Sequence, residues 1–115
     1  MRTTSILAAL VLTLSLSATN VQGAPLVTAV QCVITNQTPT VSVGQQASYV
    51  VDLSGGYGSY SIWFDYGDGL HEQRSVTDTS AIFLHTFAAP GLYTQSATVT
   101  GAGSQDICST STDVQ

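Results

Sequence analysis

Apolar and polar residues alternate at every second position along much of the chain. Two runs show this most clearly, with apolar residues at Ala47, Tyr49, Val51 and Leu53 and at Tyr60, Ile62, Phe64 and Tyr66. Because successive side chains of a β-strand point to opposite faces, a period of two predicts strands with one buried face and one exposed face. No segment carries a sustained helical period, so the pattern predicts an all-β fold.

Residues that favour turns separate these runs roughly every ten positions, a spacing typical of a β-sandwich. The predicted strands cover residues 27–35, 41–43, 47–53, 60–66, 72–76, 81–87, 92–100 and 108–114. We expect a loop at 101–105 and a sandwich of about seven or eight strands.

The N-terminus has the pattern of a secretory signal peptide. Arg2 supplies positive charge, residues 6–16 are mostly Leu, Ala, Val and Ile, and residues 21–23 offer a cleavage site. The apolar run is well short of the roughly 20 residues that a membrane-spanning helix needs. We therefore expect a signal peptide at 1–23, one domain at 24–115, secretion to the cell exterior or periplasm, and no membrane insertion after cleavage. An uncleaved N-terminal anchor is the alternative.

The two cysteines, Cys32 and Cys108, both lie in the predicted exported part. In an oxidising compartment such a pair predicts a disulfide, and a domain of this size needs one because its core alone is marginal. Zinc binding is a poorer interpretation, since a structural zinc site wants four ligands and His71 and His85 lie at no recognisable spacing.

Charge narrows the range of partners. Without Arg2, the chain has Arg74 as its single strong cation against seven carboxylates. An acidic surface of this kind does not attract phosphate groups, so we expect no binding to nucleic acid or to anionic lipid.

Two short motifs lie in the predicted strands and turns. The first is Phe64-Asp65-Tyr66-Gly67-Asp68-Gly69, and the second comprises His85-Thr86-Phe87, Pro90-Gly91 and Tyr93-Thr94. Both resemble motifs of the PKD family of extracellular immunoglobulin-like β-sandwich modules, which commonly has Trp-Asp-Phe-Gly-Asp-Gly at the position of the first motif. The resemblance implies an immunoglobulin-like sandwich that holds, spaces or recognises other molecules, often beside a larger surface or secreted protein.

The motif residues themselves have structural interpretations. Alternation places Phe64 and Tyr66 in the core. Asp68 can accept backbone N–H bonds where the chain reverses, and the Tyr93 hydroxyl can return to a nearby backbone group, as in a tyrosine corner. We interpret His85 as a partly buried hydrogen-bonding residue rather than a catalyst.

Trp63 departs from the family pattern by one position, since the family's tryptophan would fall at Phe64. Its indole should therefore point away from the core, where it could stack on a sugar ring or anchor a protein partner. Packing under a neighbouring loop or against another domain is the alternative. Trp63 is the candidate ligand-binding residue.

The acidic group Asp65, Asp68, Glu72 and Asp78 raises the question of calcium, but its spacing matches no recognised calcium loop. We expect no metal and no other cofactor. Asn36 begins a formal N-glycosylation sequon that Pro39 disfavours.

Catalysis finds little support in the sequence. No serine lies in a nucleophile elbow, there is no lysine, and pairing of the cysteines leaves no free thiol. The predicted function is a non-catalytic module for extracellular protein interaction, adhesion or spacing. The alternative is a small carbohydrate-binding module that uses Trp63.

Overall fold

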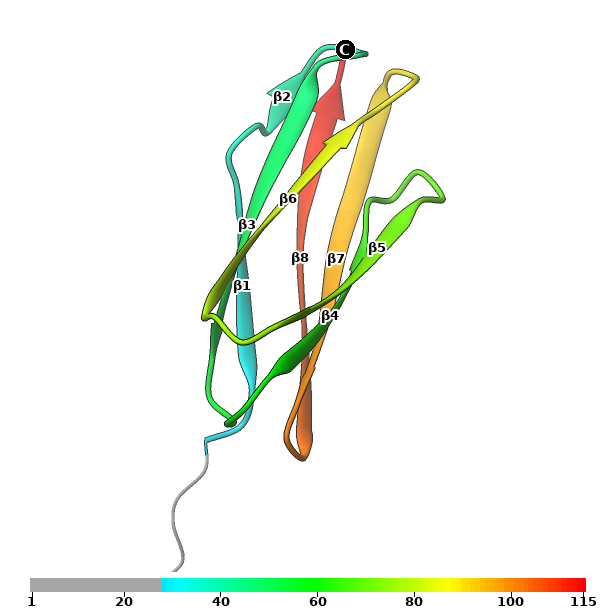
Figure 1. Ribbon diagram of the computed structural model, residues 1–115. Helices are drawn as coiled ribbons and strands as arrows, with labels where there is room; N and C mark the ends of the chain where they lie inside the picture. The colour runs from blue at the N-terminus through cyan, green and yellow to red at the C-terminus, as the bar shows by residue number, and fades with distance from the viewer. Residues whose placement is uncertain (1–27) are drawn as a thin grey trace, which may run out of the picture.

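The alternating segments form two packed sheets in the computed structural model, which describes residues 28–115 (Figure 1). The strands are β1 (Gln31–Asn36), β2 (Thr40–Val41), β3 (Gln46–Ser54), β4 (Tyr60–Asp65), β5 (His71–Val76), β6 (Ser80–Thr86), β7 (Gly91–Gly101) and β8 (Ser104–Val114). This confirms the predicted all-β sandwich. The predicted signal peptide, residues 1–23, and the start of the domain at residue 24 lie outside the described residues.

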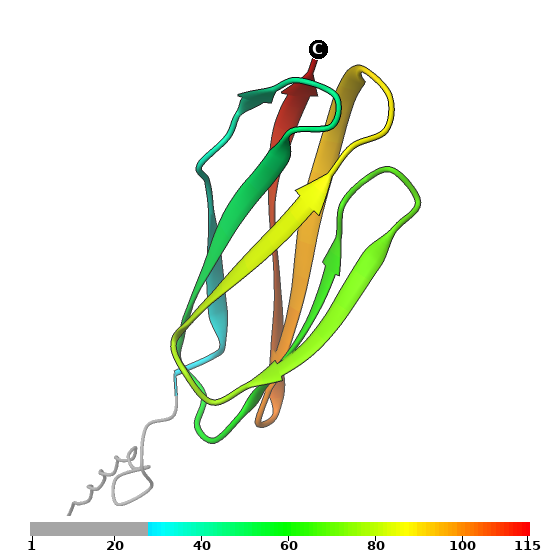
Figure 2. The same cartoon turned by 45° about the horizontal axis from the view of Figure 1, so that its top comes forward.

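One sheet has the strand order β1-β3-β6 and the other β2-β8-β7-β4-β5. All pairings are antiparallel except that of β2 with β8. Figure 2 shows the two sheets face to face, with the described chain entering at one end of the sandwich and reaching its C-terminus at the other. Within residues 28–115, no helix is long and apolar enough to cross a membrane.

Three predicted strand boundaries were wrong by two or more residues, and one of them is the end of β2, which lies at Val41 rather than at residue 43. β1 begins at Gln31 rather than at residue 27, because residues 28 and 30 bond to loops: the Gly56 N–H donates to the Thr28 carbonyl and the Val30 N–H to the Ser104 hydroxyl. β8 begins at Ser104 rather than at residue 108, because β7 and β8 remain paired as far as Gly101 and Ser104, which a tight hairpin turn connects. Gly103 makes that hairpin possible through its positive φ of 76°.

The core lies between the sheets and consists mainly of inward residues of the long strands, together with residues such as Phe87 that follow directly after a strand. Those with no exposed surface are Ala47, Tyr49, Val51, Ile62, Phe64, Phe83, Phe87, Ala97 and Val99. Two polar residues, Gln95 and Thr112, are equally buried, and the Thr112 hydroxyl donates to the Gln95 amide oxygen at 2.9 Å. The Tyr49 hydroxyl lies 2.7 Å from Thr112, so these buried polar atoms satisfy one another.

A disulfide joins the two sheets and confirms the predicted pairing. Cys32 of β1 and Cys108 of β8 have Cα atoms 5.8 Å apart and close a sequence separation of 76 residues. Beside it, the Asp106 carboxylate accepts the Cys32 N–H at 2.9 Å, and the Asn36 side-chain amide donates to the Ser111 carbonyl at 2.7 Å. These contacts cover the open edge of β1 with β8, and they occupy the side chain of the sequon asparagine.

Candidate functional site

Trp63 lies on the outward face of the five-stranded sheet. Its side chain is 42% exposed, whereas its neighbours Ile62 and Phe64 have no exposed surface. The strand register predicted from alternation is therefore confirmed at this position. The indole is the single tryptophan of the chain and stands on a strand that is paired on both sides, by β5 and β7.

The residues beside Trp63 on the outer side of the sheet are mostly uncharged. Its Cα partners across the sheet are Gln73 on β5 and Thr98 on β7. We call the outward positions of three adjacent strands the Trp63 face: Ser61, Trp63, Asp65, His71, Gln73, Ser75, Ser96, Thr98 and Thr100. Hydroxyl and amide groups dominate this face, and Asp65 is its one carboxylate.

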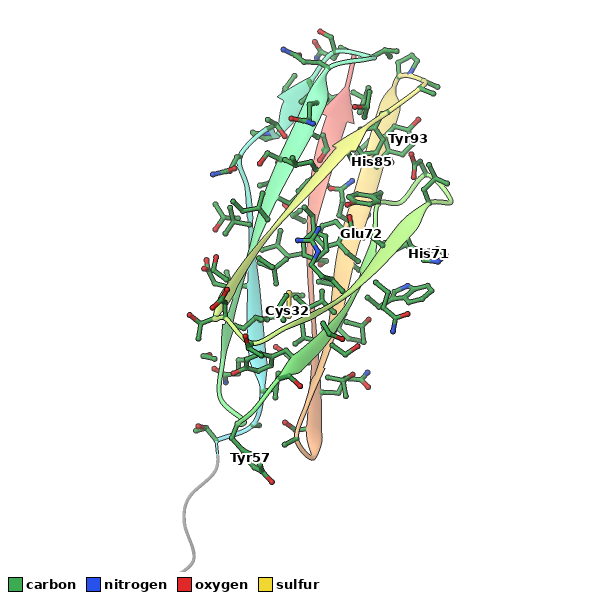
Figure 3. All side chains as sticks on the ribbon, in the orientation of Figure 1. Cys32, Tyr57, His71, Glu72, His85 and Tyr93 are labelled. Atoms are coloured by element: carbon green, nitrogen blue, oxygen red, sulfur yellow. A yellow bond between two sulfur atoms is a disulfide. The ribbon has the colours of Figure 1, made fainter. Side chains whose placement is uncertain are left out.

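His71 stacks on Trp63 and was not predicted as a site residue. The ring centroids are 4.0 Å apart and the planes are inclined by 20°. Figure 3 shows His71 projecting from the outer side of β5, whereas the following residue, Glu72, projects between the sheets. One face of the indole is thus in contact with an imidazole.

The Asp65–Gly69 turn that leads into β5 is held by its own carboxylates. Asp65 Oδ1 accepts the Gly67 N–H at 2.8 Å, and Asp68 Oδ1 accepts the Leu70 N–H at 3.1 Å. Gly67 and Gly69 adopt φ values of 88° and 94°, which favour glycine, and a Cβ on Gly67 would collide with the backbone of residue 94. The turn therefore sets the β4–β5 register that brings His71 beside Trp63.

His85 lies inside the molecule and bonds to the same turn. Its Nε2 is 2.7 Å from Asp68 Oδ2, and its ring stacks on Tyr66 at 4.0 Å between centroids. Burial by itself raises the pKa of the Asp68 carboxyl, but the hydrogen bonds from His85 and from the Leu70 N–H outweigh burial and lower it. The His85 side chain is only 11% exposed, which favours a structural role.

Glu72 and Arg74 join the two edge strands β5 and β6. The Arg74 guanidinium binds the Glu72 carboxylate, donates to the Ile82 carbonyl at 2.7 Å and lies 4.1 Å from the centre of the Phe83 ring. Burial raises the pKa of Glu72, but the hydrogen bonds from Arg74 and Tyr66 outweigh it and lower the pKa. Burial, followed by the bond to Glu72, raises the pKa of the Tyr66 hydroxyl.

Three of the four carboxylates considered for calcium are thus engaged with protein donors. The donors are the Gly67 N–H for Asp65, Leu70 and His85 for Asp68, and Arg74 and Tyr66 for Glu72. Within the described part of the chain, no group of three or more His, Cys, Asp or Glu side chains is placed to hold a metal ion.

Tyr93 has the geometry of a tyrosine corner. Its hydroxyl donates to the Ala89 carbonyl at 2.8 Å, across the turn that contains Pro90 and Gly91. Its ring stacks on the buried Phe87 at 4.7 Å between centroids. The second motif therefore ties the start of β7 to the core.

A hollow of about 390 Å³ lies at the end of the sandwich where the described residues begin. It is lined by Thr28, Ala29, Tyr57, Ala102, Gly103 and Ser104. Figure 3 shows Tyr57 at this end, far along the sandwich from His71. The hollow and the Trp63 face are separate features.

Comparison with known proteins identifies the fold. No protein-family model and no curated protein sequence match the chain. Its structure is similar to that of the PKD domain of the human VPS10 domain-containing receptor SorCS2, with 18% sequence identity and a TM-score of 0.63, over 94% of this chain and 96% of that domain. The fold is therefore that of a PKD domain, as the two motifs predicted.

A second solved structure overlaps weakly. A β-glucosidase from Listeria innocua in complex with glucose is 11% identical with a TM-score of 0.38, over 74% of this chain and 16% of that enzyme. An overlap of this extent carries no argument about function.

Proposed function

We propose that this protein is an extracellular, non-catalytic recognition module that binds a partner through the Trp63 face. One observation carries the proposal: a large aromatic residue, 42% exposed, lies on a strand that is paired on both sides. Exposed tryptophans of this kind are common anchors of binding surfaces, because a large amphipathic ring is buried at little cost in conformational entropy.

The disulfide supports an extracellular location. Cys32 and Cys108 are bonded, and stable structural disulfides belong to oxidising compartments. The predicted signal peptide at residues 1–23 points the same way.

The contacts of the titratable groups support a binding role over a catalytic one. The pairs Asp68–His85 and Glu72–Arg74 both hold the turn and the edge strands in place. A general acid or base must reach its substrate, whereas these side chains are bonded to other residues of the same chain.

The shape of the module suits adhesion or spacing. The described chain enters at one end of the sandwich and its C-terminus lies at the other (Figure 1). Segments attached at these two ends would be held apart by the length of the strands, with the Trp63 face exposed along the side. This arrangement favours a co-secreted or surface protein as the partner.

A glycan is the second candidate ligand, and the composition of the Trp63 face favours it. Gln73 and Thr98 flank the indole, and serine and threonine hydroxyls continue in the rows beyond them. Sugar rings stack on aromatic faces while their hydroxyls bond to such groups. The indole is the surface on which a ring would stack, and His71 lies over one of its faces.

The test compares Trp63→Ala with Val33→Ala, which truncates an exposed apolar residue on the other sheet, outside the Trp63 face. Each variant is immobilised and assayed for retention of co-secreted proteins, and affinity electrophoresis is run against a panel of soluble polysaccharides. Loss of one kind of binding in Trp63→Ala, with retention in Val33→Ala, supports the proposal and identifies the ligand class. Equal binding by wild type and Trp63→Ala in every assay contradicts it.

A further inference from the structure

An exposed histidine covers one face of the Trp63 indole. The two rings lie on adjacent strands with centroids 4.0 Å apart, and both side chains reach solvent. Rotation about the side-chain bonds of His71 would lift the imidazole without any change in the backbone. A ligand that stacks on this face of Trp63 must displace the imidazole, so His71 competes with the ligand.

The strength of this cover depends on charge. Histidine side chains gain their charge between about pH 5 and pH 8. A cation above an indole ring is held by the ring quadrupole, which at an exposed site changes an equilibrium roughly two- to fivefold. An imidazolium at position 71 therefore covers Trp63 more firmly than a neutral imidazole does.

The charged groups near His71 either attract its charged form towards β4 or are bonded to other residues. Asp65 of β4 is the Cα partner of His71 and shares its face, where a carboxylate attracts an imidazolium towards β4. Glu72 and Arg74 are paired with each other near the Ile82 carbonyl of β6. Asp68, in the preceding turn, bonds to His85.

We propose that His71 is a pH-dependent cover on the Trp63 indole, which weakens ligand binding in acid and frees the ring as the pH rises. The proposal rests on the proposed function in one respect, namely that ligands bind at Trp63. It adds a regulatory contact and assigns that contact to one residue. Any ligand that stacks on the covered face, whether a sugar ring or a planar protein side chain, is affected in the same sense.

The cover is tested without a ligand by acrylamide quenching of tryptophan fluorescence. Trp63 is the single tryptophan, so the signal reports on this site alone. The bimolecular quenching constant, corrected for the unquenched lifetime, is measured at pH 5 and at pH 8. We expect a smaller constant at pH 5, with the ratio of covered to uncovered indole changing roughly two- to fivefold.

Three variants isolate the contribution of His71. His71→Ala should give a larger quenching constant that is the same at both pH values, and His71→Phe a small constant that is also independent of pH. Gln73→Ala, which changes the Cα partner of Trp63 instead, should behave as wild type. His85 is present in every variant, so a pH dependence that survives in His71→Ala arises elsewhere and overturns the proposal.

Retention on a bound polysaccharide or partner separates failure of this proposal from failure of the proposed function. Binding that requires Trp63 but has the same pH dependence in wild type and His71→Ala overturns the cover and leaves the function in place. Binding that does not require Trp63 overturns the function, and with it the regulatory role of His71, even where quenching detects the covered ring.

Discussion

Neighbouring residues Trp63 and Phe64 have opposite environments, because side chains alternate along β4. We expect Trp63→Ala to change the free energy of unfolding by less than about 1 kcal/mol, since Trp63 is 42% exposed and lies outside the core. Phe64→Ala removes a ring with no exposed surface and should cost about 3–5 kcal/mol. Urea unfolding measures both values. Comparable losses in the two variants would show that the indole is part of the core.

A second prediction concerns Asp68, whose carboxylate bonds to His85 and to the Leu70 N–H. Removing it in Asp68→Ala leaves both donors without an acceptor and should cost about 1–3 kcal/mol, whether or not calcium is present. Thermal unfolding with calcium and with a chelator makes this measurement. A loss confined to calcium-containing buffer would identify the turn as a metal site instead.

The same carboxylate predicts how stability changes in acid. The pKa of Asp68 is lower in the folded protein than in the unfolded chain. Its stabilising contribution is therefore complete above the unfolded value of about 3.9 and is lost as the pH falls through the folded value. The stability advantage of wild type over Asp68→Asn should shrink between about pH 5 and pH 2. An advantage that stays constant down to pH 2 contradicts the assignment.

At the scale of elements, the two sides of the sandwich are closed in different ways. On the β1 side, the disulfide and backbone-directed bonds from β8 join the sheets. On the β5–β6 side, the bridge is non-covalent and consists chiefly of the bond from Arg74 to the Ile82 carbonyl. An edge strand whose carbonyl is occupied by an inward-pointing arginine is also poorly available for pairing with another chain.

A further prediction concerns the β5–β6 side. Arg74→Met keeps a long unbranched side chain but removes the guanidinium over the Phe83 ring, the bond to the Ile82 carbonyl and the pair with Glu72. Because the Arg74–Glu72 pair is about one-third exposed, we expect a modest loss of about 1 kcal/mol. Hydrogen exchange of β5 and β6 amides should accelerate while that of β7 and β8 is unchanged. Asp106→Ala, on the other side, serves as control and should accelerate exchange near β1.

At the scale of the whole molecule, the disulfide constrains most of the described chain. Its sequence separation of 76 residues corresponds to roughly 4 kcal/mol in the chain-entropy treatment. That is a large part of the stability of a typical small domain. We expect Cys32→Ala/Cys108→Ala to lose about this amount in urea unfolding. Alkylation of the unreduced wild-type protein should label neither thiol, and labelling of both would contradict the bond in solution.

The sequence by itself determined which segments form strands, which faces of β3 and β4 are buried, and that Trp63 points outward. These features follow from local alternation, because a strand assigns its side chains to two faces without reference to its partners. The turn glycines and the cysteine pair were likewise readable, since left-handed backbone needs glycine and an exported pair of cysteines favours oxidation.

Tertiary structure alone decided what each of those residues touches. His71 meets Trp63 because the Asp65–Gly69 turn sets the β4–β5 register, and Arg74 meets the Ile82 carbonyl because consecutive strands fold into different sheets. The sequence does not distinguish Gln95 and Thr112 from exposed polar residues. They are buried because β3, β7 and β8 bring Tyr49, Gln95 and Thr112 within hydrogen-bonding distance. Contacts between residues distant in sequence depend on register and topology, which the period of a single strand does not contain.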